Sequence, residues 1–379
     1  MNRLKIVIAP DSFKGSLTAM QVAQAMAAGI CDVDPTIETV LLPTADGGEG
    51  TMTSLVKATD GIVVTVFVQD PLGRKIEAQY GVLGDGETAV IEIAEASGVT
   101  RLQKRERNPF VASTFGTGEL IAHALDGGLR KFIIGLGGSA TNDGGAGLLQ
   151  ALGIQLLDKN SQELPRGGGA LSRLQEIDSR HFDKRIAESH FVVACDVDNP
   201  FIGPEGASAI FGPQKGATTE MVVQLDENLQ HFARQIEVLT GIALYDKKGA
   251  GAAGGAGGAL QAFFSGDMQR GIDIVLQAMS FDQQIKDADL ILTGEGKTDR
   301  QTLSGKTPFG VAQEAYRQRK PVILISGVIA EGSRSLIAPL FHEVHAVVGG
   351  AVSSKASMDN AGDFLRRKTR EVIENYMRK

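Results

Sequence analysis

Residues Leu290–Pro308 of this 379-residue chain, LILTGEGKTDRQTLSGKTP, decide the fold. The apolar run that opens the segment is typical of a buried strand, and it passes abruptly into a loop with three glycines and charges of both signs. A new helical pattern starts at Phe309. Open α/β sheets place their ligands in loops that leave the carboxyl ends of strands. We therefore expect a ligand-binding loop here rather than a charged surface turn.

The side chains of this loop suggest the chemistry of the ligand. Gly294 and Gly296 would let the backbone approach a ligand without an intervening Cβ. Glu295 is a candidate ligand for a divalent cation, while Lys297 and Lys306 are candidates for neutralising phosphate oxygens.

The N-terminal residues repeat the strand–loop–helix pattern. Leu4–Ala9 is predicted to be a buried strand, Thr18–Ile30 an amphipathic helix and Thr39–Leu42 a second strand. Thr18 followed by Gln21 is a capping box, which marks the start of the helix. A strand–helix–strand unit of this kind predicts a parallel sheet.

The middle of the chain has a different pattern. Short strands without intervening helices, such as Ile62–Val68 and Lys75–Val82, indicate antiparallel pairing. We therefore predict an α/β protein of two α/β domains. Residues 1–60 and 286–379 would form one open parallel sheet from both chain ends, and residues 61–285 an inserted mixed α/β domain. The cleft between the domains is the expected active site.

Composition excludes several classes of protein. Hydrophobic residues make up 42% and charged residues 22%, as in soluble globular enzymes. The net charge of −7 argues against a nucleic-acid or anionic-membrane surface. Cys31 and Cys195 form no CxxC pair, and both are expected to be buried apolar residues without a disulfide. No apolar run has the length of a membrane span, so a cytoplasmic enzyme is predicted.

The standard nucleotide-binding motifs fit only in part. Gly-Lys-Thr occurs at 296–298 and at 305–307, but Ile291 and Arg300 stand where a P-loop needs its first glycine. Gly135–Ala140 matches G-x-G-x-x-A and supports a rival hypothesis, an NAD-linked dehydrogenase. Asn142–Gly145 opposes it, because Asp-Gly and a further glycine disfavour a helix there. A two-lobed binding protein for a small acid is a third, non-enzymatic alternative.

Several long segments, taken together and in order, carry a family resemblance. They are APDSFKGS (9–16), PTADGGEGT (43–51), STFGTGELI (113–121), IGLGGSATNDGGAG (134–147), ACDVDNPFIGPEGA (194–207), FGPQKGA (211–217), GAGAAGGAGGAL (249–260) and LTGEGKTDRQTLSGKTP (292–308). With them the chain resembles the type I glycerate kinase family over essentially its whole length. The resemblance implies an ATP-dependent kinase that phosphorylates D-glycerate at the 2-hydroxyl. It also implies a flavodoxin-like domain, an inserted domain and a site between them.

Glycerate and ATP need cations, a proton acceptor and Mg²⁺, and we assign candidates by chemistry. Ser12 and Lys14, with Lys306, are the candidates for binding the substrate. Asp46, Asp196 and Lys297 are the candidate catalytic residues. Asp46 could instead be an Asx-turn residue.

The remaining candidates concern phosphate and metal. The predicted ATP-phosphate contacts are Gly137, Gly138, Ser139, Thr141, Gly294 and Gly296, and the predicted Mg²⁺ ligands are Asp198, Glu295 and Asp143. A helix cap is the alternative for Ser139 and Thr141, and a turn is the alternative for Asp143. The expected partner is a small molecule, D-glycerate, and a homo-oligomer is left open.

Overall fold

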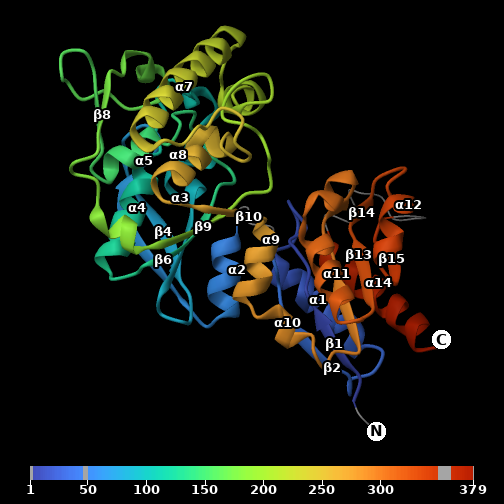
Figure 1. Ribbon diagram of the computed structural model, residues 1–379. Coiled ribbons are helices and arrows are strands. Elements are labelled where there is room, and N and C mark those ends of the chain that lie inside the picture. Colours follow the sequence, from blue (N-terminus) through green and yellow to red (C-terminus); the bar gives the residue numbers. More distant parts are fainter. Residues whose placement is uncertain (1–2, 46–49, 349–359, 379) are drawn as a thin grey trace. The chain divides into compact units, whose positions relative to one another are not determined.

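The computed structural model describes residues 3–45, 50–348 and 360–378 and divides into two compact units (Figure 1). The first unit combines Met1–Asp46 with Gly271–Lys379, and the second is Gly47–Arg270. Helix α2 (Thr51–Ala58) packs on strands of the second unit, and α9 (Gly271–Ala278) packs on helices of the first. These two helices move the boundaries away from the expected residues 60 and 285.

The first unit contains a five-stranded sheet in which every pair is parallel. In chain order its strands are β1 (Lys5–Ile8), β2 (Glu38–Leu41), β11 (Leu290–Thr293), β13 (Val322–Ser326) and β15 (Glu343–Ala346). Their order across the sheet, β2-β1-β11-β13-β15, is the flavodoxin-like order 2-1-3-4-5. The predicted fold class, with a parallel sheet built from both chain ends, is confirmed.

The strands of this sheet are apolar on both sides because helices cover both faces. Ile6 and Ile8 pack in one core with α1 (Ala19–Cys31) and α14 (Ala361–Met377), whereas Val7 packs in another with α9 and α11 (Thr307–Arg317). The capping box at Thr18 and Gln21 is present and begins α1. Short helices α10 (Phe281–Gln284) and α12 (Arg334–Ile337) complete the layer around α9 and α11.

The second unit contains a six-stranded mixed sheet in the order β10-β9-β6-β5-β4-β3. Its strands are β3 (Ile62–Gln69), β4 (Lys75–Val82), β5 (Thr88–Glu92), β6 (Lys131–Gly135), β9 (His190–Ala194) and β10 (Asp267–Gln269). The β3–β4 and β4–β5 pairs are antiparallel, as the sequence predicted. The remaining pairs are parallel, so β5, β6, β9 and β10 end at one edge.

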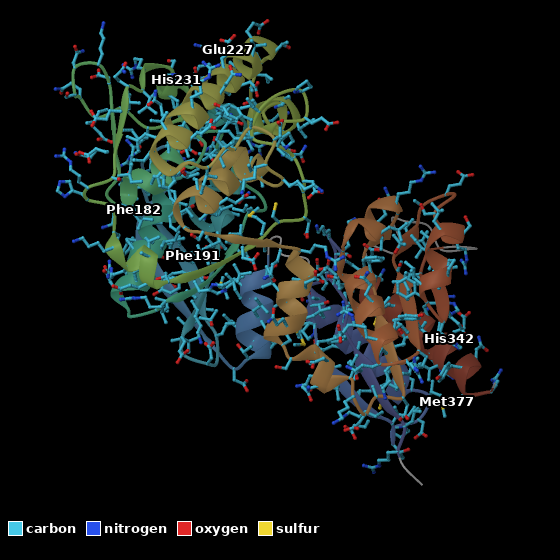
Figure 2. The ribbon with its side chains drawn as sticks, in the orientation of Figure 1. Phe182, Phe191, Glu227, His231, His342 and Met377 are labelled. Atoms are coloured by element: carbon cyan, nitrogen blue, oxygen red, sulfur yellow. The ribbon has the colours of Figure 1, made fainter. Side chains whose placement is uncertain are left out.

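Helices of the second unit build one large core on its sheet. They are α3 (Ile93–Ser97), α4 (Phe115–Asp126), α5 (Ala146–Ala151), α6 (Ala207–Phe211), α7 (Thr219–Thr240) and α8 (Ala256–Phe263). Phe191 on β9, labelled in Figure 2, lies in this core, and its ring stacks on that of Phe132 of β6 with the centroids 4.6 Å apart. A small two-stranded antiparallel sheet of β7 (Gln155–Leu157) and β8 (Glu176–Asp178) is separate from the main sheet.

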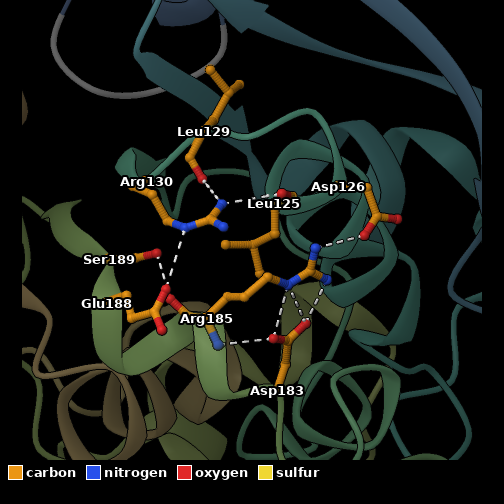
Figure 3. Close-up of polar contacts among 8 residues, drawn as sticks. All are labelled: Leu125, Asp126, Leu129, Arg130, Asp183, Arg185, Glu188 and Ser189. Carbon is orange, nitrogen blue, oxygen red and sulfur yellow. Dashed lines mark hydrogen bonds and ion pairs between the residues drawn. The ribbon is translucent and has the colours of Figure 1, made fainter.

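Two arginines fix the C-terminal end of α4 (Figure 3). Arg130 Nη1 donates to the carbonyl oxygens of Leu125 and Leu129, at 3.1 and 2.8 Å, and so links the last turn of α4 to the turn that follows it. Arg185 donates to Asp183 and, at 2.7 Å, to Asp126. These charge-assisted bonds attach the 3₁₀ turn Lys184–Glu188 to α4.

The cysteine prediction is only partly correct. Both cysteines are free, as expected, but Cys31 is exposed at the end of α1 and Cys195 is half-buried. The expectation of two buried cysteines is therefore wrong, because the end of α1 turns this position outward. Burial nevertheless raises the pKa of the Cys195 thiol to about 11. In the described part of the chain, no helix is both long and apolar enough to cross a membrane.

Candidate functional site

A cavity of about 240 Å³ opens in the first unit where the loops after β1, β11 and β13 meet. The strand order reverses between β1 and β11, because β2 follows β1 on one side and β11 lies on the other. Open α/β sheets bind ligands at such a switch point. Polar residues that line the cavity are Asp11, Ser12, Lys14, Ser16, Glu295, Lys297 and Lys306.

Glycines allow the loops around this cavity to approach one another. A Cβ on Gly294 would lie 2.4 Å from the carbonyl oxygen of Ile325, and one on Gly296 would lie 3.2 Å from the Cα of Phe13. The Gly294 carbonyl accepts the Asp11 N–H at 2.8 Å. Gly294 is buried, so its need for glycine comes from packing between strand ends, a reason different from the ligand approach that we expected.

Glu295 is the buried acid of the cavity, with 5% of its surface exposed. Its Oε1 accepts hydrogen bonds from the hydroxyls of Thr298 and Thr302, at 2.8 and 2.7 Å. Among the described residues, Oε2 makes no hydrogen bond. Burial raises the pKa of this carboxyl, although the two hydroxyls and the charge of Lys306 act in the opposite direction.

The lysines at the rim of the cavity place positive charges beside this acid. Lys297 is 65% exposed, and its Nζ lies 3.5 Å from Asp299 Oδ2, while Lys306 Nζ lies 3.9 Å from Oδ1 of the same carboxylate. Lys14 is exposed on the loop after β1. Glu295 and Lys297 thus line one cavity of the first unit.

In the second unit, the loop after β6 exposes backbone rather than side chains. Gly137 and Gly138 are exposed, and Gly138 has a φ of 75°, which favours glycine. The N–H groups of Gly137, Gly138 and Ser139 have no hydrogen-bond acceptor among the described residues. Successive free N–H groups around a left-handed residue form a concave site for an anion.

Lys215 lies beneath this loop and was not among the residues predicted from the sequence. It is 2% exposed, and its ammonium donates to Ser139 Oγ at 2.8 Å and to the Thr141 carbonyl oxygen at 2.7 Å. Burial lowers its pKa to about 7, and the charge of Asp143 acts in the opposite direction. The only sequence signal was its place in FGPQKGA, because its partners are more than seventy residues away.

Asp143 is part of the loop after β6 and holds it from its buried side. It is fully buried, and its carboxylate accepts hydrogen bonds from the N–H and hydroxyl of Thr114 and from the N–H groups of Gly145 and Gly147. Burial raises the pKa of this carboxyl, and these hydrogen bonds oppose that effect. The carboxylate joins the starts of α4 and α5. This burial is at odds with the prediction of Asp143 as a metal ligand.

Other acids stand at the same edge of the second sheet. Asp196 and Asp198 follow β9 and are exposed, and Asp198 pairs with Lys248 at 3.3 Å. Glu92, which ends β5 and was not predicted, accepts the Met52 N–H at 2.7 Å at the start of α2. Within the described ranges, no three His, Cys, Asp or Glu side chains gather as a metal site. Asp46 lies outside the described residues.

The rival dinucleotide motif lacks its helix. Strand β6 ends at Gly135, but α5 starts only at Ala146, so no helix follows directly on Gly135–Ala140. The glycine-rich stretch near Gly254 is a packing surface. A Cβ on Gly254 would lie 2.0 Å from the Thr141 carbonyl oxygen. The first glycine stretch therefore forms the loop after β6, and the second packs against this loop.

The fold and the polar loops at the strand ends are typical of an α/β enzyme. The profile of the glycerate kinase family matches residues 6–377. A glycerate kinase of Bacillus subtilis (strain 168) is 49% identical over 97% of both chains, and a glycerate 2-kinase of Escherichia coli (strain K12) is 48% identical over 86% of both. A crystal structure from Salmonella typhimurium LT2 that carries the assignment glycerate kinase 2 is 46% identical and covers 99% of both chains, with a TM-score of 0.90. The chain belongs to the glycerate kinase family, and the resemblance noted in the sequence is confirmed.

Proposed function

We propose that this enzyme transfers the γ-phosphoryl group of ATP to the 2-hydroxyl of D-glycerate, giving 2-phospho-D-glycerate and ADP. Family membership and the E. coli relative, which is named glycerate 2-kinase, support this choice. The observation that carries it is the cavity at the switch point of the first sheet. Its volume of about 240 Å³ suits a small acid, and it combines three lysines with a buried carboxylate.

Within this cavity, we propose that Lys14 and Lys306 bind the carboxylate of glycerate, with Ser12 as a hydrogen-bonding partner. Lys297 is exposed at the rim and is the proposed contact of the transferred phosphoryl group, where a cation stabilises charge in the transition state. Asp46 and Asp196 remain the proposed acceptors of the hydroxyl proton.

The phosphates of ATP are proposed to bind at the loop after β6. The N–H groups of Gly137 and Gly138 supply the donors there, and Ser139 and Thr141 help to shape the loop. Gly296 on the rim of the first cavity is a further proposed contact. Gly294 is buried and acts through packing instead.

The reaction is proposed to use Mg²⁺, which is usually held by one or two carboxylates together with phosphate oxygens. Glu295 fits this requirement, because its Oε2 has no hydrogen-bond partner among the described residues. Asp198 is exposed and fits as well, whereas the oxygens of Asp143 already accept four hydrogen bonds. When bound, Mg²⁺ would neutralise charge on the triphosphate.

Release of ADP in the presence of D-glycerate, followed by NMR of the product, tests the proposal. ADP release that requires glycerate and a 2-phosphoglycerate product are expected. Absence of ADP release would refute the kinase activity, and 3-phosphoglycerate would refute the position of transfer. Asp196→Asn should lower turnover while glycerate still binds. A protein that only binds glycerate needs no proton acceptor, so the same substitution would leave its function unchanged.

We also propose that the enzyme acts in the cytoplasm. Its two free cysteines and the lack of a disulfide between them agree with a reducing compartment.

A further inference from the structure

Lys215 is a buried amine without a paired anion, and it is a cation only below its pKa of about 7. Its two hydrogen-bond acceptors, Ser139 Oγ and the Thr141 carbonyl oxygen, are both neutral. The nearest acid that acts on it is Asp143, whose carboxylate already accepts four hydrogen bonds from other groups. Burying a charge without an opposite charge is costly. In the free enzyme, the charged form of this lysine therefore lowers the free energy of unfolding.

The loop above Lys215 also contains polar atoms that have no hydrogen-bond partner among the described residues. Thr141 Oγ1 and Asn142 Oδ1 are fully buried, and neither has a hydrogen-bond partner among the described residues. On the outer side, the N–H groups of Gly137 and Gly138 lack acceptors within the described chain. A basic side chain beneath the loop, together with unsatisfied polar atoms and N–H groups without acceptors within it, is typical of a site whose counter-charge arrives with a ligand.

We propose that Lys215 is the charge partner of the phosphate oxygens bound at Gly137–Ser139, acting through Ser139 and Thr141, and that nucleotide binding is coupled to proton uptake by Lys215. This inference rests on the proposed function. Lys215 is a positioning residue, because it is buried beneath the loop and acts on the phosphates through the groups that it holds.

The surroundings of Lys215 determine when it takes up a proton. The charged group that acts on it is Asp143, on the loop after β6, and Asp143 favours protonation. Without ligand the pKa is about 7. A bound phosphate adds negative charge and raises this pKa, so at about pH 8 binding should take up to about one proton.

Substitution by methionine separates a ligand-linked lysine from a structural one. Lys215→Met keeps the length of the side chain and removes the charge, and replacing a buried charge by an apolar group is often neutral or stabilising. We therefore expect the nucleotide-free variant to be as resistant to urea as the wild type or more so. ATP binding should weaken by about tenfold or more, because the loop loses its counter-charge.

Calorimetric titration of full-length enzyme with MgATP at about pH 8, in Tris and in HEPES, measures the protons exchanged. Buffer-dependent heats should show uptake by the wild type and by Lys184→Met, which removes an exposed lysine of the same unit. Lys215→Met should show none. Equal uptake in all three proteins would overturn this inference alone, and so would a marked loss of stability in nucleotide-free Lys215→Met. Failure of the wild type to bind ATP would overturn the proposed function with it.

Discussion

The cavity of the first unit and the loop after β6 in the second both stand at the carboxyl ends of parallel strands, yet they present charge in opposite ways. In the first, exposed lysines such as Lys297 surround a buried acid. In the second, exposed glycines present N–H groups and the lysine is hidden. Flexible side chains can follow a substrate as its charge changes, whereas backbone donors hold one geometry. The comparison supports our proposal that turnover depends on the first region and nucleotide affinity on the second.

The largest effect is expected in the first unit, from Glu295→Gln. This change keeps the shape of the side chain and removes its charge, so kcat should fall by about a hundredfold or more while the KM for ATP stays within about threefold. Steady-state ADP release at saturating glycerate measures both constants. A variant with wild-type kcat would contradict the role of Glu295 in turnover.

The stability of the same variant has a predicted dependence on pH. Burial raises the pKa of Glu295 in the folded state, so the folded state binds more protons than the unfolded state between the ordinary and the raised pKa. The contribution of Glu295 to stability is therefore present below the ordinary range and lost as pH rises through the raised pKa. Urea unfolding should be measured at several values between about pH 4 and 7. The free energy of unfolding of Glu295→Gln, relative to that of the wild type, should increase as pH rises. A gap that is constant over this range would show that the pKa is unshifted.

An intermediate effect is expected in the second unit, from Gly138→Ala. Gly138 has a φ of 75°, and alanine in this region costs about 1 kcal/mol and shifts the loop. The KM for ATP should rise by about tenfold, and the KM for glycerate should change little. Gly128→Ala is the matched control, because Gly128 has a φ of 87° in an exposed turn after α4. If both variants lose nucleotide affinity equally, general strain and not the phosphate loop is responsible.

The two regions also differ in how much of them the sequence could predict. The first unit follows from local pattern: apolar strands, the capping box at Thr18, and a loop that places Glu295 and Lys297 beside a strand end. Parallel topology then brings the loops after β1 and β11 together without further information. Ser12, Glu295 and Lys297 of this cavity are within a few positions of their strands, so local pattern alone indicates where they lie.

The second unit depends on contacts between distant segments. Lys215 meets Ser139 and Thr141 across more than seventy residues, and no periodicity indicates such a contact. Asp143 stands in a glycine-rich loop that resembles a ligand site, but its hydrogen bonds to Thr114 turn it inward. Whether a single side chain is buried depends on tertiary packing, which local sequence pattern does not show. For this reason, the burial of Lys215 and of Asp143 was not predicted.

The smallest effect is expected from Asp198→Asn, and it tests whether the exposed acids after β9 belong to either region. Asp198 and Lys248 are 80% and 82% exposed and form an ion pair at 3.3 Å. Such pairs contribute less than about 1 kcal/mol, so the urea midpoint should hardly change. If Asp198 is a ligand of Mg²⁺, the Mg²⁺ concentration for half-maximal activity should rise by about threefold, because one of few carboxylates is lost. Lys248→Met breaks the same ion pair but leaves the carboxylate, so its Mg²⁺ requirement should stay unchanged or fall. Equal Mg²⁺ dependence in the two variants would show that Asp198 is a surface partner of Lys248 and not a ligand of Mg²⁺.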